Sequence, residues 1–211
     1  MSSKKKLPKK IILIGGGGHC ISCIEVLKNV SDFDVLGIVD EYINTFSDQD
    51  IDILGKDSDL QDLRKQCDYA LICIGQIKDP SPRKKMFTKL RELNFQLPSI
   101  FSSKAYISTN IKIGLGSIIM NGCFVNSDVK IGHNCILNNK CHIEHGVNIG
   151  DNCHISTSAV INGDVTIGDD VFLGSNSTIA NGVTIGDNCI IGAGLFIGHN
   201  VEANTTLKYG S

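Results

Sequence analysis

The sequence of 211 residues predicts two structural units, an α/β unit with a short parallel sheet over residues 10–98 and a coil of stacked short parallel strands over residues 99–211. In the first half, strand and helix patterns alternate. In the second half, an aliphatic residue recurs at every sixth position. The chain also has 22 glycines and only 6% aromatic residues, which suits a repetitive core better than a conventional aromatic one. Residues 1–9 are basic and are expected to form a flexible tail.

The first unit begins with the segment KIILIGGGG at 10–18, a buried-strand pattern that runs into glycines. Helical spacing follows at 19–30, and DVLGIVDE at 34–41 reads as a second strand that ends in acidic residues. A third strand at 68–75 and a helix from about residue 82 to 94 complete a Rossmann-like unit. The basic residues Arg83, Lys84 and Lys85 on this last helix are interpreted as a solvated face.

The second unit is defined by its period. Sixteen consecutive positions spaced by six, from Ile107 to Ile197, all carry branched aliphatic residues. This period fits neither an amphipathic helix nor an alternating strand, but it suits a coil whose aliphatic residues form an interior ladder. The pattern resembles the left-handed parallel β-helix of hexapeptide repeats, in which three repeats make one triangular coil. Equivalent residues of neighbouring coils are then eighteen positions apart in sequence and about 4.8 Å apart in space.

This register places most of the cysteines in the core. The fifth position of each repeat also faces inward, and it is occupied by five of the nine cysteines, namely Cys123, Cys135, Cys141, Cys153 and Cys189. We expect free thiols that pack as small apolar groups, and we treat the isolated pair Cys20 and Cys23 in the same way. The histidine-rich run CHIEHGVNIGDNCHIS at 141–156 is then no metal site, because its cysteines face inward while His142, His145 and His154 take outward or corner positions. We predict no metal.

Charge and hydropathy exclude several partner classes. A net charge of −2 gives no general attraction to nucleic acid or to an anionic membrane. No apolar stretch reaches the roughly 18 residues that span a bilayer, so no membrane insertion is expected. The expected location is cytoplasmic.

The glycine loop at 15–18 indicates a phosphate-binding turn but departs from the dinucleotide fingerprint. In the frame GxGxxG, Gly15 and Gly17 are followed by Cys20 instead of a third glycine. A shorter nucleotide such as a UDP-sugar needs only the loop, an acid at the end of the second strand and the end of the third strand. Asp40 and Glu41, together with Gly75, supply these features, although the loop as a simple tight turn remains an alternative.

Together these motifs resemble one family. The glycine loop that ends in His19, the I-E-H motif at 143–145 and a histidine nine residues later, at 154, are similar to those of the bacterial sugar O- and N-acetyltransferases. This family, part of the hexapeptide-repeat acyltransferases, includes sialic acid O-acetyltransferases and the UDP-4-amino-4,6-dideoxy-sugar N-acetyltransferases of bacillosamine synthesis. The resemblance covers residues 10 to about 200. It implies a homotrimer with the nucleotide sugar on the N-terminal unit and acetyl-CoA along the β-helix between subunits.

The resemblance also implies roles for individual residues by their position in the motifs. His145 corresponds to the general base, and an imidazole can accept the substrate proton near neutral pH. Gly163 follows it by eighteen residues, so its N–H is expected one coil away as an oxyanion donor. Asn138 corresponds to a polar position before the base and His154 to a coenzyme contact. The remaining matches are coenzyme-lining positions at Gly163, Ser175 and Ala193, and a nucleotide-sugar pocket at Gly17, Gly18, His19, Asp40, Glu41 and Gly75.

One position departs from the family pattern. Where the family has an acidic residue directly after the base, this chain has Gly146. Asp128 and Asp164 lie one coil before and one coil after Gly146. We expect Asp164 to replace the missing acid, because it neighbours Gly163.

The predicted function is acetyl-CoA-dependent N-acetylation of the C4 amine of a UDP-linked 4-amino-4,6-dideoxy sugar. O-acetylation of sialic acid by the same base is the first alternative. A zinc enzyme of the hexapeptide-repeat type and a non-catalytic trimeric binding protein are two further alternatives.

Overall fold

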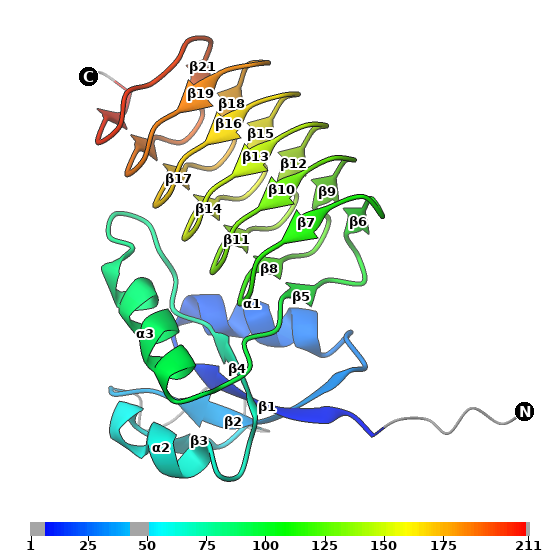
Figure 1. The fold of residues 1–211 in the computed structure, drawn as a ribbon, viewed down its shortest axis with the longest axis vertical. Helices are drawn as coiled ribbons and strands as arrows, with labels where there is room; N and C mark the ends of the chain where they lie inside the picture. Colours follow the sequence, from blue (N-terminus) through cyan, green and yellow to red (C-terminus); the bar gives the residue numbers. More distant parts are fainter. Residues whose placement is uncertain (1–6, 43–50, 210–211) are drawn as a thin grey trace, which may run out of the picture. The chain divides into compact units, whose positions relative to one another are not determined.

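The computed structural model describes residues 7–42 and 51–209 (Figure 1). The chain divides into two compact units, one formed by Met1–Gly75 with Thr88–Pro98 and the other by Gln76–Phe87 with Ser99–Ser211. The chain enters the second unit at Gln76, returns to the first at Thr88 and leaves it again after Pro98. The assignment of residues 76–87 to the second unit was not predicted.

The first unit contains a four-stranded parallel sheet in the order β3-β2-β1-β4. Its strands are β1 (Lys9–Ile14), β2 (Phe33–Val39), β3 (Ile53–Gly55) and β4 (Tyr69–Ile72). The central strand β1 is buried from Ile11 to Ile14, because its apolar side chains face both sides of the sheet. It begins at Lys9, inside the segment that was predicted as a tail, and residues 1–6 of that segment lie outside the described residues.

Helices connect these strands. Helix α1 (Gly18–Leu27) follows β1, as the sequence predicted. A 3₁₀ turn (Asp57–Asp59) leads into α2 (Leu60–Leu63), and α3 (Ser81–Glu92) follows β4. Strand β3 and the turn before α2 were not predicted, because segments this short show no hydrophobic period. None of the helices in the described residues is long and apolar enough to cross a membrane.

The second unit is the predicted left-handed parallel β-helix of hexapeptide repeats, built from two-residue strands in three parallel sheets (Figure 1). Face 1 consists of β7 (Lys112–Ile113), β10 (Lys130–Ile131), β13 (Asn148–Ile149), β16 (Thr166–Ile167) and β19 (Thr184–Ile185). Face 2 consists of β5 (Ile100–Phe101), β8 (Ile118–Ile119), β11 (Ile136–Leu137), β14 (His154–Ile155), β17 (Phe172–Leu173), β20 (Ile190–Ile191) and β22 (Thr206–Leu207). Face 3 consists of β6 (Tyr106–Ile107), β9 (Phe124–Val125), β12 (His142–Ile143), β15 (Val160–Ile161), β18 (Thr178–Ile179) and β21 (Phe196–Ile197).

The predicted register is confirmed. Ile131 pairs with Ile149, and Ile143 with Ile161, each eighteen residues further along the chain. The aliphatic ladder and the fifth-position residues form one buried core, in which the predicted cysteines Cys123, Cys135, Cys141, Cys153 and Cys189 are at most 1% exposed. All nine cysteines are free and buried, including Cys67 and Cys73, for which the sequence predicted no position.

Residues 76–87 pack on the β-helix through polar contacts. Arg83 is fully buried and donates hydrogen bonds to the carbonyl oxygens of Asn134 at 3.1 Å and Gly116 at 3.3 Å. Lys84 forms an ion pair of 2.6 Å with Asp170. The interpretation of this basic run as a solvated face was therefore wrong for Arg83 and Lys84, because their charged groups are paired at the corners of the coil.

Candidate active site on the β-helix

His145 lies at the corner between faces 3 and 1, between strands β12 and β13. The next coil places Gly163 directly beneath it. A Cβ atom at Gly163 would lie 2.5 Å from Cε1 and 2.7 Å from Nε2 of His145, so the imidazole fills the space that a side chain would occupy. The His145 side chain remains 57% exposed. The structure thus brings together the predicted base and the predicted oxyanion donor, with the ring open to an incoming substrate.

The N–H of Gly163 is available for such a substrate. Its neighbours are engaged with adjacent coils, since Asn162 N–H donates to the Ile179 carbonyl at 3.1 Å and Asp164 N–H donates to the His145 carbonyl at 2.9 Å. Within the described part of the chain, no acceptor pairs with the Gly163 N–H. A backbone donor beside a base is the arrangement that stabilises an oxyanion as it forms.

A carboxylate reaches the base from the following coil. Oδ1 of Asp164 lies 3.9 Å from Nδ1 of His145, too far for a hydrogen bond but close enough for a charge interaction. Gly146 has φ of +70°, and a Cβ there would lie 2.2 Å from the same Asp164 oxygen. Asp164 therefore occupies the space beside Gly146. The other candidate, Asp128, instead accepts a hydrogen bond from the Asn110 side chain.

His154 is buried and has protein partners at both ring nitrogens. Its Nε2 lies 3.2 Å from the amide nitrogen of Asn138, and its Nδ1 is hydrogen-bonded to the carbonyl oxygen of Gln76. Because a carbonyl only accepts, Nδ1 carries the proton and Nε2 accepts from Asn138. The ring packs edge-on to Phe172 with centroids 5.3 Å apart. His154 was expected at an outward or corner position, and it does point out of the coil, but residues 76–87 cover it and leave it 6% exposed.

The remaining predicted coenzyme positions lie at a different corner. Ser175 and Ala193 occupy the corner between faces 2 and 3, one coil apart, and Ser175 Oγ lies 3.0 Å from Ser156 Oγ. His145 and Gly163 occupy the corner between faces 3 and 1. The two groups of residues are thus separated by the width of face 3 within one chain.

Sequence reasoning missed a polar cluster directly before the base. Oε2 of Glu144 accepts a hydrogen bond of 2.7 Å from the Asn126 amide, and Oε1 lies 2.9 Å from Nε2 of His142. The Asn126 hydrogen bond, followed by that of His142, lowers the pKa of the Glu144 carboxyl. His142 also stacks on Phe124, with ring centroids 4.6 Å apart. The sequence signal for this cluster was the eighteen-residue spacing between Asn126 and Glu144, which places the two residues on neighbouring coils. Glu144 directly precedes His145.

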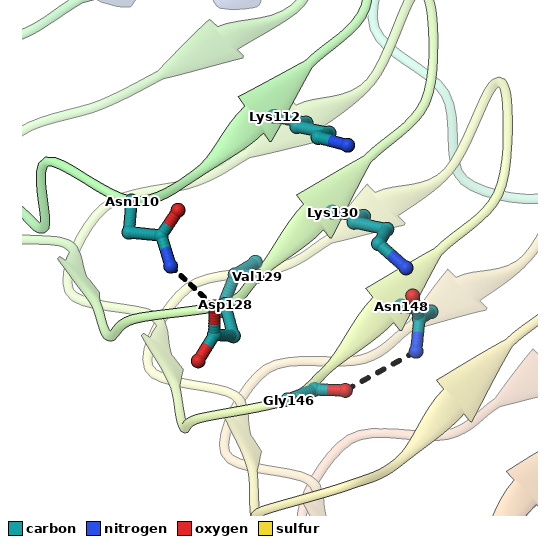
Figure 2. A pocket seen from close by; sticks show the side chains of 7 residues that line it. All are labelled: Asn110, Lys112, Asp128, Val129, Lys130, Gly146 and Asn148. Carbon is teal, nitrogen blue, oxygen red and sulfur yellow. Dashed lines mark hydrogen bonds between the residues drawn. The ribbon is translucent and has the colours of Figure 1, made fainter.

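Face 1 carries a groove of about 380 Å³ next to this corner (Figure 2). Lys112 and Lys130 extend side by side from neighbouring strands, and Gly146, the residue after the base, lies at the edge. The sequence analysis did not identify these lysines. The lining residues are Asn110, Lys112, Asp128, Val129, Lys130, Gly146 and Asn148.

In the first unit, the predicted nucleotide residues gather at the carboxyl ends of β1, β2 and β4, the edge at which parallel α/β sheets bind ligands. Helix α1 begins at Gly18, and Cβ atoms at Gly17 or Gly18 would meet nothing within 4 Å, so this side of the helix N-terminus is open. A Cβ at Gly75 would lie 3.6 Å from Cβ of His19, whose Nε2 is 3.5 Å from the Cys23 sulfur.

The carboxylates of the two acids after β2 accept hydrogen bonds from backbone N–H groups. Oδ2 of Asp40 accepts from the Gly16 N–H at 2.7 Å and thereby fixes the glycine loop, while Oδ1 accepts from the Tyr42 N–H at 2.8 Å. Oε1 of Glu41 accepts from the Asp57 N–H at 3.1 Å. Asp40 is therefore a support of the predicted phosphate loop. Among the described residues, no cluster of three or more histidine, cysteine or acidic side chains is arranged to hold a metal ion.

Comparisons with known families agree with both units. The PglD N-terminal domain family matches residues 10–90. The bacterial transferase hexapeptide family (six repeats) matches residues 128–163, and the hexapeptide repeat of succinyl-transferase matches residues 164–199. A sequence search among curated proteins found no significant match.

Several solved structures share the whole architecture. PerB, a perosamine N-acetyltransferase from Caulobacter crescentus solved with CoA and GDP-perosamine, is 29% identical, with a TM-score of 0.87 over 93% of this chain and 92% of that one. The acetyltransferase domain of PglB from Neisseria gonorrhoeae, solved with acetyl coenzyme A, is 21% identical, with a TM-score of 0.88 over 94% and 95% of the two chains. WeeI from Acinetobacter baumannii is 20% identical, with a TM-score of 0.73 over 94% and 95%. The resemblance, the fold class and the acetyltransferase class predicted from the sequence are confirmed.

Proposed function

We propose that the chain transfers the acetyl group of acetyl-CoA to the amine of a nucleotide-linked amino sugar, because its first unit matches the PglD N-terminal domain family and its second unit matches two hexapeptide-repeat transferase families. The similarity to PerB, a perosamine N-acetyltransferase solved with GDP-perosamine, favours an amine over the hydroxyl of sialic acid. The observation that carries the proposal is the imidazole of His145 lying against Gly163, whose N–H has no acceptor within the described part of the chain.

In the proposed reaction, the sugar amine attacks the thioester carbonyl while His145 takes a proton from its nitrogen. The N–C bond forms, and the carbonyl oxygen becomes an oxyanion that accepts a hydrogen bond from the Gly163 N–H. Collapse of this intermediate breaks the C–S bond. The imidazolium returns the proton to the leaving sulfur, so the products are the acetamido sugar and free CoA.

Asp164 supports this cycle by its charge. When His145 takes the proton, it becomes a cation 3.9 Å from the carboxylate oxygen of Asp164, and the pair attract each other. The family places this acid directly after the base, whereas here it comes from the next coil. Asn138 has a different role in the proposal, because it is bound to His154 and holds that ring in place.

The nucleotide would bind at the first unit. The open N-terminus of α1 presents backbone N–H groups and a favourable dipole to phosphate at Gly17 and Gly18. His19 and Gly75 border this end of the sheet, while Asp40 and Glu41 stabilise the loops around it. We propose a UDP-linked 4-amino-4,6-dideoxy sugar, as the sequence motifs indicate, with a GDP-linked amino sugar as the second substrate to examine.

The coenzyme positions support a site shared between protomers. Ser175 and Ala193 lie at a different corner from His145 and Gly163. In a three-fold assembly, one corner of one protomer can face another corner of its neighbour, so that a coenzyme contacts both. We therefore propose that the active enzyme is a homotrimer.

The test is acetyl transfer by the purified protein from acetyl-CoA to a panel of UDP-, GDP- and dTDP-linked 4-amino sugars, followed by release of the CoA thiol and by product mass. We expect one nucleotide amino sugar to give product at its amine. Acetylation of free sialic acid together with no reaction on the whole panel would contradict the proposal and support the O-acetyltransferase alternative.

A further inference from the structure

Lys112 and Lys130 are neighbours in register on face 1. Strand β7 pairs in parallel with β10 so that Lys130 lies opposite Lys112, which places their backbones about 4.8 Å apart. Both side chains are exposed and extend in the same direction over the groove (Figure 2). Like charges directly opposite each other destabilise a sheet. The fold therefore maintains an unfavourable pair beside the candidate active site.

Lys112 and Lys130 have no ion-pair partner among the described residues. No carboxylate in that part of the chain forms an ion pair with either lysine. Asp128, an acidic residue that lines the same groove, accepts a hydrogen bond from Asn110 and lies at the corner where β10 begins (Figure 2). The two ammonium groups face open solvent.

The row of lysines ends at Lys130 and does not continue into the following coils. The equivalent positions of the following coils are Asn148, Thr166 and Thr184, which are all uncharged. The amide of Asn148 donates to the Gly146 carbonyl at 3.1 Å and closes the groove at the corner that carries His145. A ligand lying over the lysines would therefore reach Gly146, the residue that follows the base.

From this arrangement we propose that Lys112 and Lys130 form a subsite for a diphosphate group. Two cations one strand spacing apart match the two charged phosphoryl groups of a diphosphate, and charge-assisted hydrogen bonds from lysine to phosphate oxygens are strong. A volume of about 380 Å³ lies in the range of small-ligand pockets. The proposal deepens the proposed function and rests on it, because both of its substrates, the nucleotide sugar and acetyl-CoA, contain a diphosphate.

The experiment measures binding rather than turnover. Isothermal titration of the full-length protein with inorganic pyrophosphate, with UDP and GDP, and with CoA compares the wild type with Lys112→Gln/Lys130→Gln. Lys65→Gln/Lys85→Gln removes two exposed lysines that lie outside the coil and serves as the control of equal charge. We expect the first double variant to weaken pyrophosphate binding about 10- to 100-fold, the range for losing charge-assisted hydrogen bonds, with no change in the control.

Comparison of UDP and GDP with CoA identifies which substrate supplies the diphosphate. A loss of affinity for CoA alone assigns the subsite to the coenzyme. A loss for UDP or GDP alone assigns it to the nucleotide sugar and overturns the placement of that diphosphate at the N-terminus of α1. Equal affinities of wild type and variant for all probes, or no binding of any probe by the wild type, would overturn the subsite. The variant should unfold at the same or a higher temperature, because like-charge repulsion is removed.

Failure of the subsite can be separated from failure of the proposed function. If the wild type acetylates an amino sugar while the variant binds every probe normally, only the subsite is wrong. If the variant loses diphosphate affinity but the wild type acetylates none of the panel, the subsite stands and the proposed reaction is wrong.

Discussion

At the scale of single residues, two glycines of the candidate site are explained by side chains one coil away. Gly163 leaves room for the imidazole of His145, and Gly146 leaves room for the carboxylate of Asp164. Gly146 also has φ of +70°, a conformation that most side chains avoid. A side chain at position 146 would therefore require the Asp164 carboxylate to move from the place it occupies beside His145.

His145→Ala should lower kcat by about 10²- to 10⁴-fold, the range for removing a general base. The KM values and the unfolding temperature should barely change, because the side chain is mostly exposed. Steady-state kinetics and thermal denaturation measure both, and His199→Ala, an exposed histidine of the last coils, is the control. A fully active His145→Ala enzyme would exclude this residue as the base.

Asp164→Asn should lower kcat by at most about 5-fold, the equivalent of about 1 kcal/mol, with both KM values unchanged. Two unit charges about 4 Å apart attract by about 1 kcal/mol in water, and this attraction exists only when His145 is protonated during the reaction. Asp128→Asn is the matched control, because Asp128 lies at the same corner two coils before Asp164 but pairs with Asn110. Equal kcat values for the two variants would show that His145 works without the carboxylate of Asp164.

At the scale of elements, the coil is held together by its eighteen-residue register. Each strand contributes one aliphatic side chain to the interior, and small residues, including five cysteines, fill the space beside it. Asparagine and aspartate tolerate the left-handed conformation at the corners, as at Asn134, Asp164 and Asn188. The corners can therefore carry polar side chains while the interior stays apolar.

The cysteines should be protected from thiol reagents in the native protein. All nine are buried, and burial raises the pKa of the Cys73 and Cys153 thiols well above the usual range, so little thiolate forms near neutral pH. Titration with a chromogenic disulfide should give slow reaction in buffer and nine thiols in denaturant. Rapid reaction of several thiols in the native protein would contradict the assigned register.

At the scale of the whole molecule, the second unit includes a segment that precedes it in sequence. Residues 76–87 bring Gln76, Arg83 and Lys84 onto the β-helix, where they bind the ring of His154, the carbonyls of Asn134 and Gly116, and the carboxylate of Asp170. The β-helix unit therefore depends on residues from both halves of the chain.

Size-exclusion chromatography with light scattering should find a trimer, and acetyl transfer should be lost when the trimer dissociates. The reason is that Ser175 and Ala193 lie at a different corner from His145 and Gly163, so one chain does not bring the proposed coenzyme contacts to the base. Activity at increasing dilution should fall with the trimer fraction. A monomer with full specific activity would refute the shared site.

The sequence by itself determined the β-helix, its core cysteines and the stacking of His145 on Gly163, because a fixed period sets which residues become neighbours in successive coils. It also identified the glycine loop and the acids after β2. Only the tertiary structure showed that Asp128 pairs with Asn110 while Asp164 lies near His145, that Gln76 covers His154, and that Arg83 binds carbonyls of the coil. Such contacts join segments that share no period, and 78 positions separate Gln76 from His154. A local pattern carries no information about which distant segment covers a side chain, because burial there depends on how the chain folds back.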